Sequence, residues 1–289
     1  MLPVWVLLQP RDYINSHQLF IGLALLFLGV IVSQPIVSAP AIRPLSDPSA
    51  PNLFPLLFVT IACGAISGFH GLVASGTTSK QLENFADARM IGYGGMLGEG
   101  TLALISTIAA VAGISLVGHA NLPSNGYIAD LDWSKYYDTW EHASGNKAAA
   151  FVLGGGALIK SLGIPQSFAN TLMAVLVISF AATTLDTAMR IQRFILNEFG
   201  KAANIEIFSN KYLGTLIAVL PALLMAFWNI EDPSSGISRQ AGWVLWPIFG
   251  ASNQMLAALT LMVLTLYFWK KRKPILPLLI PMLLLMIIT

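Results

Sequence analysis

Charged side chains are scarce in this sequence. They make up 10% of the 289 residues, whereas hydrophobic residues make up 55%; soluble domains typically carry about 25% charged residues. The uncharged residues gather in long apolar runs, which excludes an ordinary soluble domain and indicates an integral membrane protein whose main surroundings are a lipid bilayer. The net charge of +2 comes without a basic patch interleaved with aromatic residues, so we predict no nucleic-acid partner.

Cysteine and the common catalytic motifs are also scarce or missing. Cys63 is the only cysteine, which excludes an intrachain disulfide. The four histidines, His17, His70, His119 and His142, are dispersed along the chain, so a metal centre is not expected. The sequence contains no H-E-x-x-H, C-x-x-C, G-x-S-x-G or Walker motif. We therefore predict no metal, no cofactor, no direct use of ATP and no enzymatic activity.

The chain is organised around the segment Leu53–Ala74. It is long and apolar enough to cross a bilayer, which takes about 20 residues, yet small residues interrupt it. These are Gly64, Ser67, Gly68, Gly71, Ser75 and Gly76. The glycines around His70 predict an unwound segment, which membrane proteins tolerate only where protein or water satisfies the backbone. In secondary transporters such broken helices hold substrate and ion sites. We expect a solvated polar run, Ser75–Lys80, to close the segment.

The remaining apolar runs complete the layout. The predicted spans are Leu19–Val37, Gly94–Val117, Ser167–Met189, Tyr212–Trp228 and Trp243–Trp269, and Ile275–Thr289 starts another that is short for a crossing. A Pro-rich loop with Pro40, Pro44, Pro48 and Pro51 follows the first span, and a charged segment, Lys80–Arg89, follows the broken one. Lys147–Gly163 is also short and is expected to be re-entrant or interfacial. We thus expect an all-α polytopic bundle that forms one membrane domain over residues 1–289.

The distribution of cations orients this bundle. Alternating the loops puts eleven of the 16 Lys and Arg residues on one side, which the positive-inside rule assigns to the cytoplasm. They are Arg11, Lys80, Arg89, Arg190, Arg193, Lys201, Lys211, Lys270, Lys271, Arg272 and Lys273. Residues 119–146 are then a non-cytoplasmic loop and residues 190–211 a cytoplasmic connector. The first residues show no basic region or cleavage site, so no signal peptide is expected.

Three ionisable residues lie inside predicted spans, where such groups usually face partners or a water-filled path. His70 suits proton coupling or binding of a substrate carboxylate, or it bonds a freed backbone carbonyl. Glu99, in the first turns of its span, suits proton transfer in a low dielectric, or it pairs with Arg89. Asp186 suits a proton relay, or it forms a structural ion pair with Arg190, four residues away on the same helix face.

Uncharged polar residues form a second group of candidates. Ser67 and Gly68 belong to the predicted break. Thr77 and Thr78 contact an ion or, as we favour, cap the segment that follows. Asn253, followed by Gln254, contacts substrate or, as we favour, bonds neighbouring helices together. The hydroxyls of residues 183, 184 and 187 line a path or satisfy their own helix backbone.

Four ordered stretches resemble one known family. They are C-G-A-I-S-G-F-H-G-L-V-A-S-G-T-T-S-K-Q-L from Cys63, I-G-Y-G-G-M-L-G-E from Ile91, T-T-L-D-T-A-M-R-I-Q-R from Thr183 and W-P-I-F-G-A-S-N-Q-M-L-A from Trp246. The stretch Pro3–Tyr13 fits as well. Together they resemble the carbon starvation protein A (CstA) family of bacterial inner-membrane transporters, over nearly the whole chain.

The resemblance implies uptake of peptides, or of pyruvate, under nutrient limitation, and an APC/LeuT-like architecture with paired five-helix repeats. Proton coupling through His70, Glu99 and Asp186 is our own expectation. Family members are longer, so the chain is expected to correspond to the C-terminal half, with a missing N-terminal half or a second copy as partner. Two other classes stay open: a membrane sensor or scaffold in the starvation response, and an intramembrane protease, which needs two membrane carboxylates.

Overall fold

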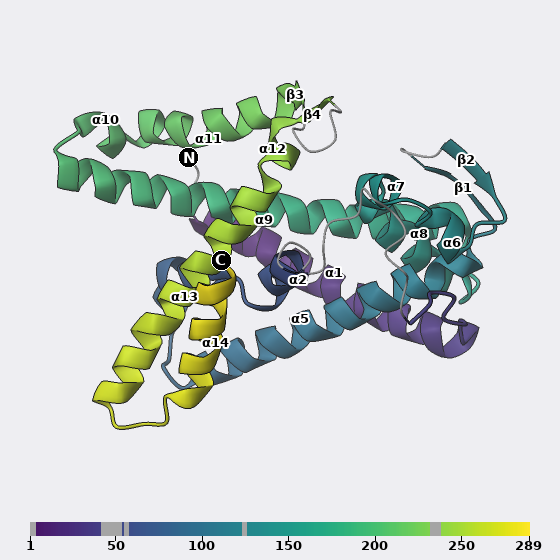
Figure 1. Ribbon diagram of the computed structural model, residues 1–289, viewed down its shortest axis with the longest axis horizontal. Coiled ribbons are helices and arrows are strands. Elements are labelled where there is room, and N and C mark those ends of the chain that lie inside the picture. The colour runs from purple at the N-terminus through teal and green to yellow at the C-terminus, as the bar shows by residue number, and fades with distance from the viewer. Residues whose placement is uncertain (1–3, 42–53, 55–57, 123–125, 232–237) are drawn as a thin grey trace. The chain divides into compact units, whose positions relative to one another are not determined.

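The computed structural model describes residues 4–41, 54, 58–122, 126–231 and 238–289 (Figure 1). Most of the predicted Pro-rich loop and the predicted start of the broken span at Leu53 lie outside these residues. The chain divides into two compact units. One comprises Met1–Ala50 and Arg89–Asp186, and the other comprises Pro51–Ala88 and Thr187–Thr289. Each unit is described by itself.

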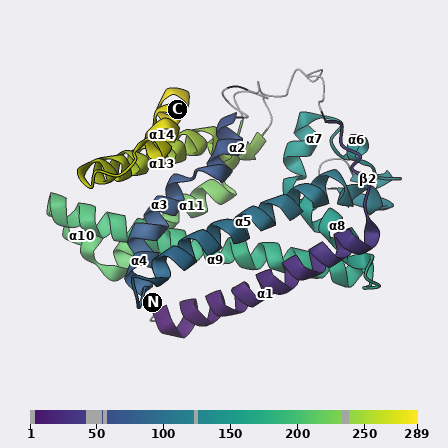
Figure 2. The same ribbon diagram turned by 90° about the horizontal axis from the view of Figure 1, so that it is seen from below.

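The first unit is built on long helices that run alongside one another (Figure 2). It contains α1 (Val4–Ser33), nearly all of α5 (Asp87–Val111), a 3-10 turn (Gly113–Leu116), β1 (His119–Leu122), β2 (Gly126–Ala129), α6 (Trp133–Tyr136), α7 (Trp140–Gly145), α8 (Lys147–Lys160) and the first half of α9 (Gln166–Ala203).

The second unit begins with an interrupted helix and ends with a helical hairpin. Its elements are α2 (Phe58–Ala65), α3 (Gly68–Val73), a π-helical turn (Ala74–Thr78), α4 (Ser79–Gln81), the end of α9, α10 (Glu206–Ser209), α11 (Lys211–Phe227), β3 (Asn229–Glu231), β4 (Ser238–Gln240), α12 (Ala241–Val244), α13 (Trp246–Lys270) and α14 (Leu276–Ile288). Helices α13 and α14 form the hairpin (Figure 1).

The expected all-α polytopic bundle is confirmed. Within the described residues, four helical segments are long and apolar enough to cross a bilayer: Pro10–Ser33, Asp87–Val111, Gln166–Ala203 and Trp246–Lys270. Two shorter apolar helices, Tyr212–Phe227 and Leu276–Ile288, accompany them. Many large apolar side chains on these helices are exposed, including Phe20, Ile178 and Val263, as expected for helices surrounded by lipid. The chain is therefore a membrane protein.

Several helices extend beyond the predicted membrane spans. The predictions started spans at Leu19 and Gly94 and ended one at Met189, but α1 begins by Val4, α5 begins at Asp87 and α9 continues to Ala203. Charged residues end an apolar run, but Arg, Gln, Glu, Lys and Ala are good helix formers and the helix continues through them. At about 57 Å, α9 is far longer than the ~30 Å hydrocarbon core. The first part of the predicted connector 190–211 is therefore helical.

The described residues of the predicted loop 119–146 form a pair of strands followed by short helices. Strands β1 and β2 pair antiparallel, with His119 opposite Ala129. Tyr136 is 0% exposed and its hydroxyl donates a hydrogen bond to the Asn146 carbonyl at 2.6 Å; burial raises the pKa of this phenol. Asp132 caps α6 by accepting from the Lys135 N–H at 2.8 Å, and this bond lowers the pKa of its carboxyl group. A buried apolar cluster beneath the strands explains why this polar sequence folds.

Helix α8 is largely buried within the first unit. Its 14 residues rise about 21 Å, which agrees with the prediction of a segment too short to span. Side chains from α1, α5, α8 and α9 meet in one core, where Leu26, Ile105, Leu158 and Met173 are fully buried. The close approach of α8 to its neighbours, including α5, depends on the run Gly154–Gly156. A Cβ at Gly154 would meet the backbone of Ala109, with the carbonyl carbon at 2.9 Å.

We expect two adjacent glycine substitutions in α8 to differ. Gly154→Ala forces α8 away from rigid backbone and should cost about 1–3 kcal/mol of stability, the usual range for overpacking. Gly155→Ala meets only the ends of side chains, Met173 Cε at 2.6 Å and Leu26 Cδ2 at 3.3 Å, and should cost less than Gly154→Ala because these groups can shift more easily than backbone. Thermal unfolding of the purified protein in detergent measures both, and equal losses would contradict this packing.

Candidate functional site

The predicted break in the apolar segment is confirmed. Helix α2 ends at Ala65 and α3 begins at Gly68, so Ile66 and Ser67 interrupt the helix. Ser67 is extended, with φ −94° and ψ 130°, and its hydroxyl caps α3 by accepting from the Phe69 N–H at 3.3 Å. The break therefore precedes His70, which the sequence analysis had placed inside the unwound part, and His70 lies within α3.

Asn253 of α13 holds this break in place. Its side-chain oxygen accepts from the Phe69 N–H at 3.0 Å and from the Ser67 hydroxyl at 3.2 Å. Its amide nitrogen donates to Cys63 Sγ at 3.0 Å and to Ser67 Oγ at 3.1 Å. Asn253 is only 6% exposed. One buried amide thus bonds α2, the break and α3, which confirms the interhelical role expected for Asn253.

Glycines bring α13 close enough for these bonds. A Cβ at Gly68 would lie 2.7 Å from the Ala257 N atom, and one at Gly71 would lie 2.8 Å from the Thr260 hydroxyl. Gly64, in contrast, has open space around it. The glycines of α3 therefore make the close helix contact, and Gly64 does not.

The polar run expected to close the segment is helical. Ser75–Lys80 passes through the π-helical turn into α4, which ends at Gln81, and the residues of the run are exposed or half-buried. Ser75 Oγ donates to the Gly71 carbonyl at 2.8 Å, which ties this turn to α3. Thr78 precedes α4 in helical conformation and makes no side-chain cap, and Thr77 lies beside it in the π turn. π turns occur frequently at functional sites.

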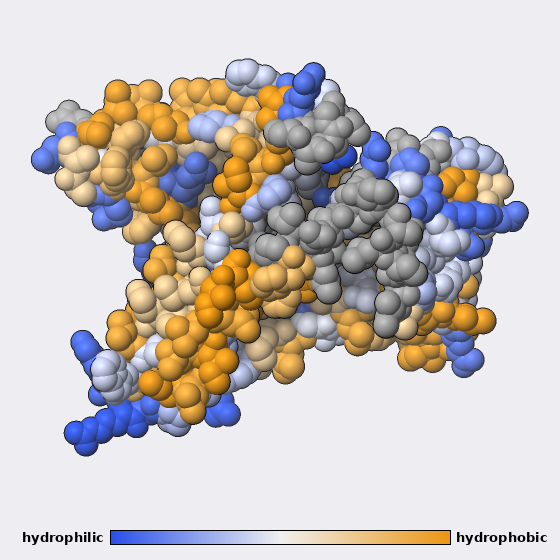
Figure 3. All heavy atoms as spheres, in the orientation of Figure 1, coloured by the Kyte–Doolittle hydropathy of each residue, from blue (hydrophilic) through white to orange (hydrophobic). Residues whose placement is uncertain are grey.

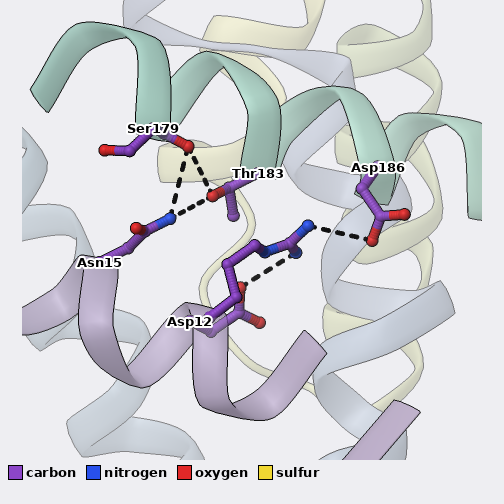
Figure 4. Close-up of polar contacts among 6 residues, drawn as sticks. Asp12, Asn15, Ser179, Thr183 and Asp186 are labelled. Carbon is purple, nitrogen blue, oxygen red and sulfur yellow. Dashed lines mark hydrogen bonds and ion pairs between the residues drawn. The ribbon is translucent and has the colours of Figure 1, made fainter. Parts of the chain in front are cut away.

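A second polar group joins α1 to α9 in the first unit (Figure 4). Asn15 is 6% exposed, and its amide donates to the Thr183 hydroxyl and to the Ser179 carbonyl at 3.4 Å. The Ser179 hydroxyl donates to Gln18 Oε1 at 3.1 Å. Thr183 also donates to the Ser179 carbonyl at 2.8 Å, so its predicted backbone bond is confirmed. The two helices therefore share a seam of hydrogen bonds within candidate spans.

Asp186 lies at one end of this seam. Its Oδ2 is 3.2 Å from Arg11 Nη1, and Arg11 also contacts Asp12 Oδ1 at 3.1 Å. The side chains of Arg11 and Asp186 are 23% and 32% exposed. Arg11 belongs to another helix, so this ion pair joins α1 to α9. The pairing of Asp186 with Arg190, one of the two alternatives from the sequence, stays a prediction. Arg11 offsets part of the charge of Asp186 at a partly exposed position.

Glu99 lies at the middle of α5, contrary to the expectation that it occupies the first turns of its span. Arg89 is ten residues away on the same helix, about 15 Å along the axis, so the predicted pairing of these two residues is wrong. The neighbouring glycines 92, 94, 95 and 98 neither break α5 nor contact a neighbour, since a Cβ at any of them would meet nothing within 4 Å.

The structure thus brings some predicted residues together. Ser67, Gly68 and Asn253 meet at the break, and His70, Thr77 and Thr78 follow within the same segment; Glu99 and Asp186 belong to the first unit. Arg11, Asn15, Gln18 and Ser179 were missed. Their spacing along α1, Arg11–Asn15–Gln18, places them on one helix face, and this periodicity was the available signal. Within the described residues, no group of three or more His, Cys, Asp or Glu residues could hold a metal.

Comparison with known proteins identifies the family. The family model described as carbon starvation protein CstA matches residues 1–289. The chain belongs to the CstA family. The peptide transporter CstA of Mycobacterium tuberculosis strain H37Rv is 34% identical, over 94% of this chain and 40% of that protein. The peptide transporter CstA of Escherichia coli K12 is 30% identical, over 94% and 44%.

A second kind of relative carries a different substrate in its name. The pyruvate/proton symporter BtsT of Escherichia coli K12 is 32% identical, over 94% of this chain and 45% of that protein. The CstA-family chain therefore spans less than half the length of these relatives. No solved structure matches it.

Replacing Asn253 tests whether its side-chain amide holds the break in place. Asn253→Ala removes the nearer of the two acceptors of the Phe69 N–H, together with the bonds to Ser67 and Cys63, and should cost about 1–3 kcal/mol, the range for losing buried hydrogen-bond partners. The matched control is Ser252→Ala, because the exposed Ser252 hydroxyl bonds only its own helix at the Ile248 carbonyl. In thermal unfolding in detergent, Asn253→Ala should melt at a lower temperature than Ser252→Ala. Equal melting temperatures would contradict a stabilising role of the Asn253 amide at the break.

A double-mutant cycle tests the ion pair between Arg11 and Asp186. We expect Arg11→Gln and Asp186→Asn to couple by about 0.5–1 kcal/mol in thermal unfolding, because the pair is partly exposed and therefore partly screened. The control pair, Lys201 with Glu198 at 3.1 Å, has side chains 61% and 54% exposed and should couple by less than about 0.5 kcal/mol. The reverse order would show that the inter-helix pair is not formed.

Proposed function

We propose that this CstA-family chain forms the transport core, or part of the core, of a secondary active transporter in the bacterial plasma membrane. Its substrates would be peptides or a small carboxylate such as pyruvate, and protons would drive uptake. The names of the relatives support this proposal, since they include peptide transporters and a pyruvate/proton symporter. The same names favour a non-enzymatic role.

One structural observation carries the proposal: a helix broken at Ser67 and closed by the buried amide of Asn253. A membrane helix that only anchors a protein has no need of such a break, because an unwound turn in lipid leaves backbone groups unsatisfied. Broken helices of this kind hold ligands in secondary transporters. We assign the break and the following turn, with His70, Thr77 and Thr78, to the substrate site.

Charge supports the choice of substrate. His70 is the ionisable residue of α3, four residues before the π-helical turn, and an imidazolium there would attract the carboxylate of a peptide or of pyruvate. Ser67 and Asn253 are engaged with each other and would act as supports for the site. Their role is to hold the geometry of the break while the substrate binds beside it.

The carboxylates of the first unit would couple transport to protons. Glu99 lies at mid-helix in α5, and Asp186 has a partner, Arg11, that it can release. Protonation of Asp186 removes its charge and weakens this ion pair between α1 and α9, so proton uptake would loosen one end of the seam. Alternating access in an APC/LeuT-like arrangement, with residues 119–146 outside and 190–211 in the cytoplasm, would use such a step.

Uptake into vesicles tests the proposal. Vesicles containing the chain should accumulate labelled dipeptide or pyruvate when an inward proton gradient is imposed, and a protonophore should abolish the accumulation. His70→Gln should weaken substrate binding, Glu99→Gln and Asp186→Asn should remove the dependence on the gradient, and Lys201→Gln should change nothing.

The test is run in two formats because the chain spans less than half the length of its relatives. It is run with the chain alone and with the chain co-expressed with the part of the Escherichia coli relative that the match does not cover. If the accumulation of dipeptide and pyruvate does not depend on the proton gradient in either format, although the protein is shown to be inserted and folded, the proposal is overturned.

A further inference from the structure

Four cations occupy the turn between α13 and α14. Lys270, Lys271, Arg272 and Lys273 are consecutive and all are exposed. The helices on either side are apolar, and Figure 3 shows hydrophilic spheres at the tip of this hydrophobic hairpin, at the lower left. The turn therefore concentrates positive charge at the end of a membrane hairpin.

The hairpin supplies no counter-charge for these residues. From residue 233 to the last residue, Thr289, the sequence contains no Asp or Glu. Within the part of the chain that the structure describes, no ion pair reaches residues 270–273. A cluster of cations without acidic neighbours attracts anions from its surroundings.

The backbone of the turn does not explain the choice of arginine. The Lys273 N–H donates to the Phe268 carbonyl at 3.0 Å and the Arg272 N–H donates to the Trp269 carbonyl at 2.9 Å. This pattern is a Schellman motif, in which the residue after the cap takes the left-handed conformation and is usually glycine. Arg272 has φ +53°. A side chain in this left-handed conformation costs stability relative to glycine. The backbone conformation therefore disfavours an arginine at this position.

Aromatic rings place the turn at the depth of the lipid headgroups. Tyr267 and Trp269 are exposed, Trp269 at 68%, and exposed aromatics at the end of an apolar helix mark the interface of the bilayer. The Lys271 ammonium lies 5.9 Å from the centre of the Tyr267 ring, and the Lys273 ammonium lies 5.8 Å from that of Phe268. The cations thus lie directly beside the aromatic interface.

We propose that the turn Lys270–Lys273 binds the phosphate headgroups of anionic phospholipids. Arg272 presents a planar guanidinium that can hold two phosphate oxygens at once, and the lysines beside it add charge without competing for that geometry. This site goes beyond transport: it requires neither a substrate nor a proton gradient. It would fix the hairpin of α13, which carries Asn253, to the membrane surface.

Native mass spectrometry of the whole chain measures the binding, with phosphatidylglycerol as the probe and phosphatidylcholine as the neutral lipid. Arg272→Gly is the decisive variant because glycine suits the left-handed turn, so the fold should be at least as stable as in wild type. Three cations remain to keep the topology. We expect its phosphatidylglycerol affinity to fall roughly fivefold, the effect of one interfacial charge, with phosphatidylcholine binding unchanged.

The controls separate this site from general charge effects. Lys201→Gln removes one exposed cation from α9 and should leave phosphatidylglycerol binding as in wild type. Arg272→Lys should retain part of the binding that Arg272→Gly loses. Wild-type affinity in Arg272→Gly, equal losses in Arg272→Gly and Lys201→Gln, or displacement of the lipid by an equal concentration of inorganic phosphate would each overturn the proposal.

Discussion

The rest of the second unit depends on one constraint: a backbone opened inside a bilayer must find hydrogen-bond partners within the protein. At Ile66 and Ser67 the helix opens, and Asn253 supplies an acceptor for the Phe69 N–H at 3.0 Å. An unsatisfied backbone group in hydrocarbon costs several kcal/mol, so the break depends on the acceptors that Asn253 and the Ser67 hydroxyl provide. The glycines of α3 follow from the same requirement, because a side chain at Gly68 would push α13 and its amide away.

The first unit is packed differently. Small residues on the short, buried helix α8 allow close contacts, and polar bonds join α1 to α9 at one end of that pair. Gly154 lets α8 touch the backbone of Ala109, and beyond the apolar core the α1–α9 contact turns polar, from Gln18 with Ser179 to Arg11 with Asp186. Apolar contact in lipid has little hydrophobic driving force, so close packing and hydrogen bonds must hold helices together. The polar end is the part that a change of charge can loosen, which is why Asp186 suits a coupling role.

Much of this arrangement can be read from the sequence, and the failures have physical causes. Hydropathy located the spans, but the helices extend beyond them to Val4, Asp87 and Ala203, because hydropathy reports where the bilayer ends and helix propensity decides where the helix ends. The glycines and Ser67 predicted the break, and an amide within an apolar run predicted a helix contact. The partners themselves, Cys63 for Asn253 and Arg11 for Asp186, depend on tertiary packing across 190 and 175 residues of chain, which a single sequence does not contain.

The exchange rate of the Phe69 amide hydrogen shows whether Asn253 holds the break closed. Hydrogen–deuterium exchange of the protein in lipid nanodiscs, read at single-residue resolution, compares this amide with those in the middle of α13. The account predicts that Phe69 exchanges as slowly as the helix interior and that Asn253→Leu accelerates Phe69 while leaving the α13 amides slow. Fast exchange at Phe69 in the wild type, or no acceleration in the variant, would contradict a break that is held closed by Asn253.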